Sequence, residues 1–147
     1  MYQYVPESST PILEKFICCL MWDGKKNIAR QIMADALNDL KRFGHADPLA
    51  AFDSAVHKVM PQIEVRPKRV GGAVYQIPME VSSKRQLSLA IRWILNASRK
   101  KHGQPMFKRL AIELNDALNE TGDAFKKKMD VKKMAEANKA FAHLANY

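Results

Sequence analysis

Four histidines are the first residues to consider for chemistry, because imidazole serves as a general acid or base and as a metal ligand near neutral pH. They are scattered along the chain, and no pair has the i, i+4 spacing that places two imidazoles on one face of a helix. Isolated histidines are more often satisfied by a hydrogen bond or by solvent than bound to a metal. No metal site and no catalytic site is therefore expected at His45, His57, His102 or His143.

The cysteines and the paired glycines also lie in surroundings that do not favour chemistry. Cys18 and Cys19 are adjacent, so on a helix they point in different directions, and we expect reduced, partly buried thiols. Gly71-Gly72 lacks the Gly-Lys-Ser/Thr ending and the following helix of a phosphate-binding loop. No serine, cysteine or lysine has a context that favours a nucleophile. We expect no cofactor, no small-molecule substrate and no enzymatic activity.

Basic residues give the composition its strongest signal, with 24 Lys and Arg against 15 Asp and Glu and a formal net charge of +9. This exceeds what solubility requires and predicts a polyanionic partner. A membrane fits less well, because no apolar stretch approaches the ~20 residues of a span and the basic clusters are dispersed over several elements. RNA, with its irregular phosphate surface, suits such a footprint. The alternative is a basic adaptor that binds an acidic protein surface.

One basic cluster lies in a segment with strand-like alternation. Arg66, Lys68 and Arg69 are close together, whereas the acids of this segment, Glu64 and Glu80, lie at the ends remote from the glycine pair. A two-stranded ribbon with a basic tip can lie in a nucleic-acid groove, where glycine lets the backbone approach closely. The alternative is a hairpin whose charges only prevent edge aggregation. Apolar residues beside the tip favour a partner over that alternative.

A second cluster follows the hairpin. Arg85, Arg92 and Arg99 are seven residues apart, so on a helix they form one narrow stripe that Lys100-Lys101 extend. Such a stripe is often only a solvated face. Positions 82–111 contain no acidic residue, however, so these cations are expected to repel one another until an external anion neutralises them. The run Lys126–Lys128 and the pair Lys25-Lys26 are weaker signals of contact.

Six helices are expected around these clusters, each with one apolar face turned to a common core. The predicted helices span 11–21 after a Thr10 cap and Pro11, about 25–43 closed by Gly44, and 48–60 after an Asp47 cap, ended by Pro61. The fourth opens with a Ser83–Gln86 capping box and ends near Lys101, and the fifth runs from Pro105 and is closed by Gly122. Asp130 is expected to cap a sixth, with Met134, Ala137, Asn138 and Phe141 inward, and on the second helix Ile28, Ile32, Ala36, Leu37 and Leu40 are expected inward.

Residues 63–81 have the period of two expected of a β-hairpin with glycines at its bend. A two-residue Gly71-Gly72 turn would pair Val65 with Pro78 and divide the apolar residues between the two faces. A loop of three or five residues would place Ile63 and Val65 on the face of Ile77, so a bulged turn is predicted. The fold class predicted is mainly α, one domain over residues 1–147 with a protruding hairpin between the third and fourth helices.

Four stretches carry a resemblance to a known family: FICCLMWDGKKNIA at 16–29, VRPKRVGGAVYQIPMEV at 65–81, LAIRWILNAS at 89–98 and MAEANKAFAH at 134–143. In this order they resemble bacterial-type ribosomal protein seven of the small subunit, over essentially the whole chain. The resemblance implies a primary binder of the 3′ major domain of small-subunit ribosomal RNA that organises assembly of the head. It further implies a hairpin at the exit site for transfer RNA near the messenger path, with neighbouring head and platform proteins as partners.

The resemblance also assigns residues. Arg92 and Trp93 form the family's arginine-tryptophan pair, with Trp93 expected in the core and Arg92 in contact with RNA. The hairpin positions near transfer and messenger RNA are Arg69, Val70, Gly71, Gly72, Ala73 and Tyr75. Together with the basic clusters, the positions expected to contact ribosomal RNA are Lys25, Lys26, Arg66, Lys68, Arg69, Arg85, Arg92, Arg99, Lys100, Lys101, Lys126, Lys127 and Lys128.

The chain departs from the family pattern in three places. Family members begin with an arginine-rich arm, but here no basic residue precedes Lys15, and no secretory signal is evident in that region. Pro67 occupies a hairpin position that is often polar or basic, and Trp22 is unexpected beside Asp23. These departures favour a mitochondrial member over one of the bacterial cytoplasm.

Overall fold

Six α-helices, one β-hairpin and a final 3₁₀ helix follow one another in residues 9–146, the part of the chain that this computed structural model describes. The expectation of a missing basic arm falls on residues 1–8, outside that part. The mainly helical class and the place of the hairpin between the third and fourth helices are confirmed. The elements are α1 (Pro11–Leu20), α2 (Lys26–Arg42), α3 (Pro48–Val59), β1 (Ile63–Val70), β2 (Ala73–Glu80), α4 (Ser83–Lys100), α5 (Met106–Leu118), α6 (Gly122–Ala137) and η1 (Lys139–Asn146).

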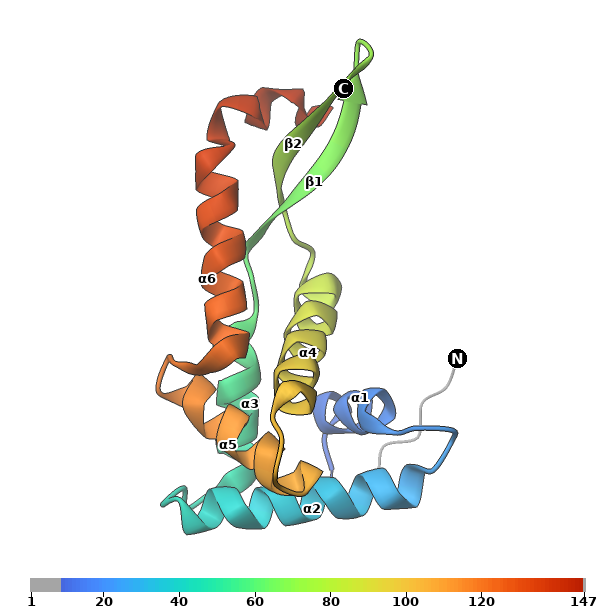
Figure 1. Ribbon diagram of the computed structural model, residues 1–147, viewed down its shortest axis with the longest axis vertical. Coiled ribbons are helices and arrows are strands. Elements are labelled where there is room, and N and C mark those ends of the chain that lie inside the picture. The colour runs from blue at the N-terminus through green and yellow to red at the C-terminus, as the bar shows by residue number, and fades with distance from the viewer. Residues whose placement is uncertain (1–8, 147) are drawn as a thin grey trace.

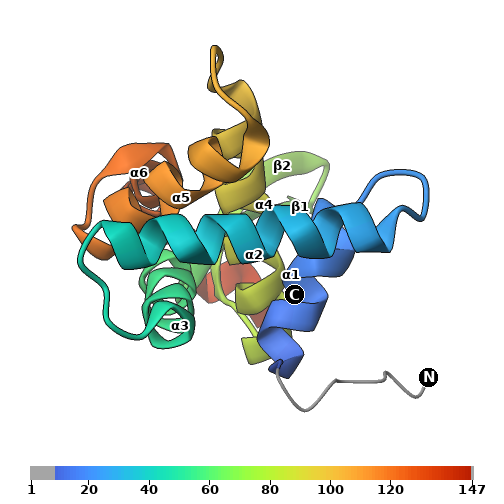
Figure 2. The same cartoon turned by 90° about the horizontal axis from the view of Figure 1, so that it is seen from below.

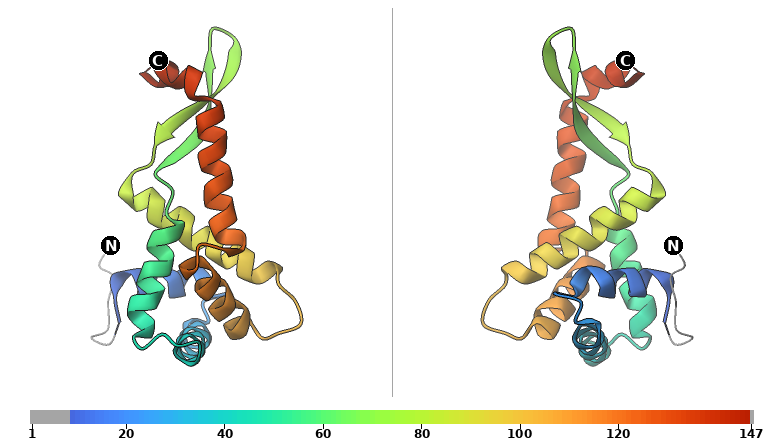
Figure 3. Two further views of the ribbon diagram at one scale, coloured as in Figure 1. Left: turned by 90° about the vertical axis from the view of Figure 1, so that its left-hand side faces the viewer. Right: turned by 90° about the vertical axis from the view of Figure 1, so that its right-hand side faces the viewer.

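The molecule has a helical body and a long projection. Helices α1 to α5 form the body, while the hairpin and α6 rise from it side by side, and η1 lies across β2 near the far end (Figure 1). The side views show the same arrangement, with the tip of the hairpin reaching beyond η1 (Figure 3). A two-stranded ribbon alone is marginally stable in water, so its packing against α6 and η1 supports it.

Local capping signals explain where α1 and α3 begin. The backbone N–H of Leu13 donates to Thr10 Oγ1 at 3.2 Å, and that of Ala50 donates to Asp47 Oδ1 at 3.2 Å. A proline follows each cap at the first helical position, where its missing N–H costs no hydrogen bond. Both predicted helix starts are confirmed.

The predicted inward face of α2 is wrong in one respect. Ile28 is 58% exposed, and the buried apolar residues are Ala29, Met33, Ala36 and Leu40. These four follow the i, i+4, i+7, i+11 series of a single helical face. The small alanines let α2 pack closely across the end of the body, where it contacts α1, α3 and α5 (Figure 2).

The apolar core is formed by residues of α1, α2, α3, α4 and α5 together with Ala124 of α6. Phe16 of α1 and Phe52 of α3 meet edge to face at its centre, with ring centroids 5.1 Å apart and both side chains fully buried. Such a pair adds about 0.5–1.5 kcal/mol beyond the buried area itself. Helix α4 contributes Ile91, Ile94 and Leu95 to the same core, which fixes the direction in which its opposite face points.

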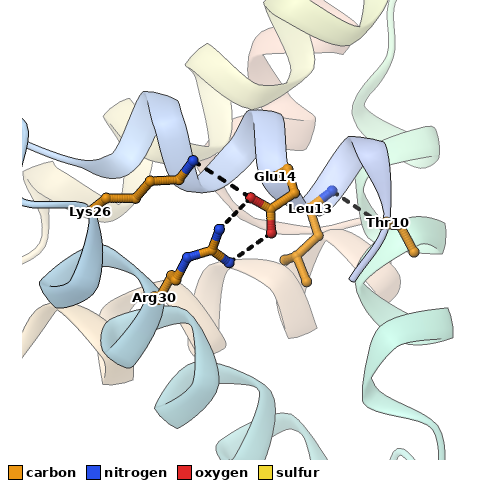
Figure 4. Close-up of polar contacts among 5 residues, drawn as sticks. All are labelled: Thr10, Leu13, Glu14, Lys26 and Arg30. Atoms are coloured by element: carbon orange, nitrogen blue, oxygen red, sulfur yellow. Dashed lines mark hydrogen bonds and ion pairs between the residues drawn. The ribbon is translucent and has the colours of Figure 1, made fainter. Parts of the chain in front are cut away.

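A buried carboxylate joins α1 to α2. Glu14 is fully buried and accepts two hydrogen bonds of 2.7 Å from the guanidinium of Arg30, while Lys26 Nζ lies 3.8 Å away (Figure 4). The hydrogen bonds from Arg30 hold the pKa of Glu14 below its ordinary value of 4.5, against the opposing effect of burial. This pair fixes the angle between the two helices and hence the course of the connection between them.

The bulged turn predicted for the hairpin is wrong. Val70 pairs with Ala73 and Val65 with Pro78, so the turn consists of Gly71 and Gly72 alone. Their φ angles of +59° and +85° are those of a type I′ turn, which glycine adopts without strain.

A bulged turn was expected on the assumption that only one face of the ribbon is covered. Ile77 and Pro78 point to opposite faces, and both are buried. On one face Tyr75 meets η1, whereas on the other Ile63 lies beside Lys128 and Lys132 of α6. Apolar residues are therefore needed on both faces.

Two further helix starts differ from prediction. Ser82 is the residue before α4, and neither it nor Ser83 makes the side-chain bond of a capping box. Helix α6 begins at Gly122, eight residues before the expected Asp130 cap, and Lys126–Lys128 lie inside it. Gly122 has φ +86°, and a Cβ there would lie 2.8 Å from Asp116 Cβ, so this glycine permits a close junction between α5 and α6.

The side chains predicted to point inward from the sixth helix are also mostly outside. Met134 is 55% exposed, Ala137 is exposed, and Asn138 and Phe141 are half-buried beyond or at the end of the helix. Only Ala124 and Ala135 of α6 are buried, because this helix leaves the body and supports the ribbon. A helix in that position has little core to face.

Removal of Arg30 tests the buried pair. Arg30→Ala leaves Glu14 buried without its main counter-ion, and we expect the free energy of unfolding at pH 7 to fall by roughly 2–4 kcal/mol. Because the pKa of Glu14 is lower in the folded than in the unfolded chain, the contribution of the pair is present above pH ~4.5 and is lost as the pH falls through the folded pKa. Urea unfolding at pH 7 and at pH 3 measures both effects.

The matched control for this test is Arg42→Ala. Arg42 forms an ion pair with Asp39 near the end of α2, and its side chain is 80% exposed. The substitution should cost less than about 1 kcal/mol. An equal loss in the two variants, or a loss from Arg30→Ala that does not shrink at low pH, would contradict the assignment.

Candidate nucleic-acid interface

Metal binding is the first chemistry to consider among the described residues. No group of three or more His, Cys, Asp and Glu side chains in residues 9–146 is placed to hold a metal ion. His45 Nε2 lies 2.9 Å from Asn115 Oδ1, and the Nδ1 atoms of His57 and His143 lie 2.7 Å and 3.0 Å from backbone oxygens of their own segments. These histidines have local structural partners. Within the same part of the chain, no helix has the length and apolarity that a bilayer crossing requires.

The outward face of α4 is the centre of a basic surface. It carries Lys84, Arg92, Arg99 and Lys100, and among the described residues no acid lies within ion-pair distance of any of them. We define the basic surface as these four together with Lys15 of α1 and Lys126 and Lys127 of α6. On this surface three helices present cations that form no ion pair among the described residues.

Two hollows flank α4 on this surface. A cavity of about 680 Å³ lies between α4 and α6, lined by Trp93, Arg99, Lys100, Lys126 and Lys127 among others, with Asp123 and Asp130 on its α6 side. A smaller one of about 220 Å³ lies between α1 and α4 and includes Lys15, Arg92 and Arg99. Grooves with cationic walls can follow the phosphate backbone of a folded RNA.

Several predicted contact residues have partners inside the protein instead. Arg85 Nε donates to Glu64 Oε1 at 2.8 Å, so the expectation that the whole stripe lacks acidic partners is wrong. Burial alone would raise the pKa of Glu64, but its hydrogen bonds with Arg85 and Arg66 lower it overall. The acid of this pair lies 21 residues earlier in the sequence, beyond the reach of any helical spacing rule.

Lys101 also has an acidic partner inside the protein, unlike its neighbour Lys100. Its Nζ lies 3.0 Å from Oε2 of Glu113, which is fully buried, and 3.7 Å from Asp116. Oε1 of Glu113 accepts a hydrogen bond of 2.9 Å from the backbone N–H of Ala124, in the first turn of α6. Glu113 therefore ties the ends of α4 and α6 to α5.

Lys128 has a partner inside the protein, unlike the adjacent Lys126 and Lys127. Its Nζ donates to the carbonyl of Lys58 in the last turn of α3 at 2.8 Å, and desolvation followed by the charge of Lys132 lowers its pKa. Lys58 donates in turn to the carbonyl of Leu118 at 2.8 Å, at the end of α5. Cations at these positions satisfy carbonyls that helix ends leave without partners. Lys128 thus has a structural role that the run of three lysines did not reveal.

The hairpin presents fewer free cations than predicted. Arg66 Nε donates to Glu64 Oε1 at 2.8 Å, and Lys68 Nζ donates to the carbonyl of Ala145 at 3.0 Å. Tyr75 packs on Phe141 with ring centroids 5.3 Å apart. Arg69 remains exposed near the tip, where Gly71, Gly72 and Ala73 are also exposed and Val70 is half-buried.

The remaining predicted positions fall into two groups. Lys25 is exposed at the start of α2, whereas Lys26 lies 3.8 Å from Glu14 and contributes to the buried pair. Arg92 is exposed as expected, but Trp93 is half-buried and packs against the edge of the core. Part of Trp93 lines the larger cavity.

Two members of the basic surface were not predicted. Lys84 lies two helical turns before Arg92, and the i, i+4, i+8 spacing through Ser88 would have identified it. Lys15 belongs to α1, and its Nζ donates to Ser88 Oγ at 3.2 Å, a contact between residues 73 positions apart. Only the tertiary fold brings Lys15 to α4.

Comparison with known proteins gives matches over most of the chain. Residues 2–139 match the family described as ribosomal protein S7p/S5e. The chain is 50% identical over 138 residues to the small ribosomal subunit protein uS7 of Dictyoglomus thermophilum, covering 94% of this chain and 88% of that protein. It is 52% identical over 132 residues to the protein of that name in Thermosipho africanus, covering 90% and 85%, and 53% identical over 132 residues to that of Thermotoga neapolitana, covering 90% and 85%. These relatives are bacterial and lend no support to the expected mitochondrial source.

Lys100 and Lys101, at the end of α4, test whether the cations with internal partners stabilise the fold and the exposed ones do not. Lys101→Ala leaves the buried Glu113 without its nearest cation, and the free energy of unfolding should fall by about 1–3 kcal/mol. Lys100→Ala removes an exposed side chain without an internal ion pair and should change it by less than about 0.5 kcal/mol. Chemical denaturation of the two variants measures the difference, and equal effects would refute this distinction.

Proposed function

Because this chain belongs to the ribosomal protein S7p/S5e family, we propose that it is a structural, RNA-binding component of the small ribosomal subunit. The relatives at about 50% identity carry the name of a small-subunit protein, and the chain spans most of their length. In this role the protein is a scaffold for RNA and not an enzyme. The bacterial sources of these relatives favour a bacterial ribosome over a mitochondrial one.

The observation that carries this proposal is the basic surface around α4. Five of its cations, those without a side-chain or backbone partner among the described residues, belong to two helices that are separated in sequence but adjacent in space: Lys84, Arg92, Lys100, Lys126 and Lys127. An array of this kind repels itself and is stabilised by a polyanion. Phosphate groups of a folded RNA provide negative charge in an irregular arrangement that suits cations dispersed around two hollows.

We further propose that the RNA is the 3′ major domain of small-subunit ribosomal RNA and that binding organises assembly of the head. The basic surface lies on α1, α4 and the first turns of α6, whereas the exposed tip of the hairpin lies at the far end of the projection (Figure 1). One molecule can therefore contact RNA at two separated places. Neighbouring head and platform proteins would contact the remaining faces.

The hairpin tip is proposed to reach the exit site for transfer RNA, near the messenger path. Its two-residue glycine turn is narrow, and Arg69 is an exposed cation beside it. The strands below are held on both faces by α6 and η1. A tip that is narrow and well supported suits a close approach to nucleic-acid backbone.

Salt dependence and substitution test the proposal together. The affinity for a fragment of the 3′ major domain should fall steeply with salt, and Arg92→Ala with Lys84→Ala should weaken binding while lowering the slope of log K against log salt by roughly 1–2. Both side chains are exposed and form no ion pair with the residues that the structure describes, so the unfolding midpoint should stay unchanged. Filter binding over a series of salt concentrations measures affinity and slope.

The control is Arg42→Ala, which removes an exposed cation at the C-terminal end of α2. It should leave RNA affinity nearly unchanged. Binding insensitive to salt and to the double substitution would exclude the proposal. Co-purification with an acidic protein that survives ribonuclease treatment would support the basic-adaptor alternative.

A further inference from the structure

Trp22 is the most exposed large apolar side chain of the described residues, with 67% of its surface accessible. It lies in the connection between α1 and α2, which turns outward at one edge of the molecule (Figure 2). An indole exposed to this degree contributes little to folding. Its position among cations suggests a use in binding.

The backbone holds Trp22 in a defined place. Asp23 and Gly24 have φ angles of +52° and +73°, and the N–H of Lys25 donates to the carbonyl of Trp22 at 2.9 Å. These are the features of a hydrogen-bonded type I′ turn with Trp22 as its first residue. The Glu14–Arg30 pair fixes the helices on either side of this turn. An ordered platform loses little conformational freedom on binding.

Arg99 of α4 supports the indole from a different element. Its guanidinium carbon lies 5.1 Å from the ring centroid, and Nη2 donates to the carbonyl of Cys19 at 3.4 Å. The arginine lies over the ring, and Trp22 is nevertheless 67% exposed. Stacked aromatic and guanidinium groups of this kind form platforms for unpaired nucleobases.

The surroundings of Trp22 favour RNA over a protein partner. Arg99 is shared between this contact and both hollows beside α4, so the platform adjoins the grooves of the basic surface. The exposed Lys25 closes the turn, and Asp23 is its single acid. An acidic backbone that follows the groove past Lys15 and Arg92 would reach Trp22.

We infer that Trp22, supported by Arg99, stacks an unpaired nucleobase of the bound RNA. This inference rests on the proposed RNA-binding function and adds to it a base-contacting site outside the phosphate-binding cations. Stacking requires a π-face and not a particular base, so the site would select for an unstacked nucleotide.

Tryptophan fluorescence tests the contact directly, because the chain has two tryptophans. In Trp93→Phe, Trp22 is the sole reporter, and the fragment of the 3′ major domain should quench it and protect it from acrylamide. Inorganic polyphosphate, which has charge but no bases, should bind the cations without that protection. RNA that binds the Trp93→Phe protein at normal affinity but leaves Trp22 accessible would overturn the inference and would reassign the indole to a protein contact.

Affinity provides the second readout. Trp22→Ala should raise the Kd for the same fragment on the order of tenfold, while Trp22→Phe, which keeps an aromatic face, should restore most of the loss. Phe43→Ala is the matched control, since Phe43 is 49% exposed at the opposite end of α2. An unchanged Kd for Trp22→Ala would overturn the stacking inference. If binding still fell with salt, the proposed RNA-binding function would stand. Absence of any RNA binding by the unmodified chain would overturn both.

Discussion

The relative position of the two helices that carry most of the basic surface, α4 and α6, depends on the buried carboxylate of Glu113. One of its oxygens lies against Lys101 at the end of α4, and the other accepts the N–H of Ala124 at the beginning of α6. A fully buried acid is costly unless it is paired and hydrogen-bonded, and these two partners compensate its charge. Because the partners belong to different helices, the same contacts fix the angle at which α4 and α6 diverge. The cavity between them, with its lysines on both walls, follows from that angle.

The basic residues of this protein serve two purposes, and sequence position does not distinguish them. Lys58, Arg109 and Lys128 donate to carbonyls at the ends of α5, α4 and α3, respectively, and Arg85 compensates the acid at the base of the hairpin. These cations hold helices together. Lys127, next to Lys128, and Lys100, next to the paired Lys101, have no such partner among the described residues and line the cavity. Some of the basic residues therefore stabilise the fold, and others form a positively charged surface that an external anion would neutralise.

Local chemistry was readable from the sequence, whereas contacts across the fold were not. Thr10 and Asp47 marked helix starts because a cap and its proline act within four residues. Gly122 misled because a glycine with positive φ can end one helix or begin another, and only the close approach of Asp116 decides between them. The Arg85–Glu64 pair and the position of Lys15 beside Ser88 depend on distant segments. The sequence located the basic hairpin and the basic helix as secondary-structure elements, but which of their cations have partners inside the protein could be seen only in the tertiary structure.

The two-residue turn also limits how the hairpin can change in length. Every residue of the ribbon has a prescribed face, with η1 against one and α6 against the other. A single inserted residue in one strand would exchange the faces of all residues beyond it and set charged side chains against η1 or α6. One residue added to each strand beside the tip would preserve every pairing below. Insertions and deletions in the hairpin of related proteins should therefore occur as one residue in each strand. The length of the hairpin then changes by one pair of residues at a time.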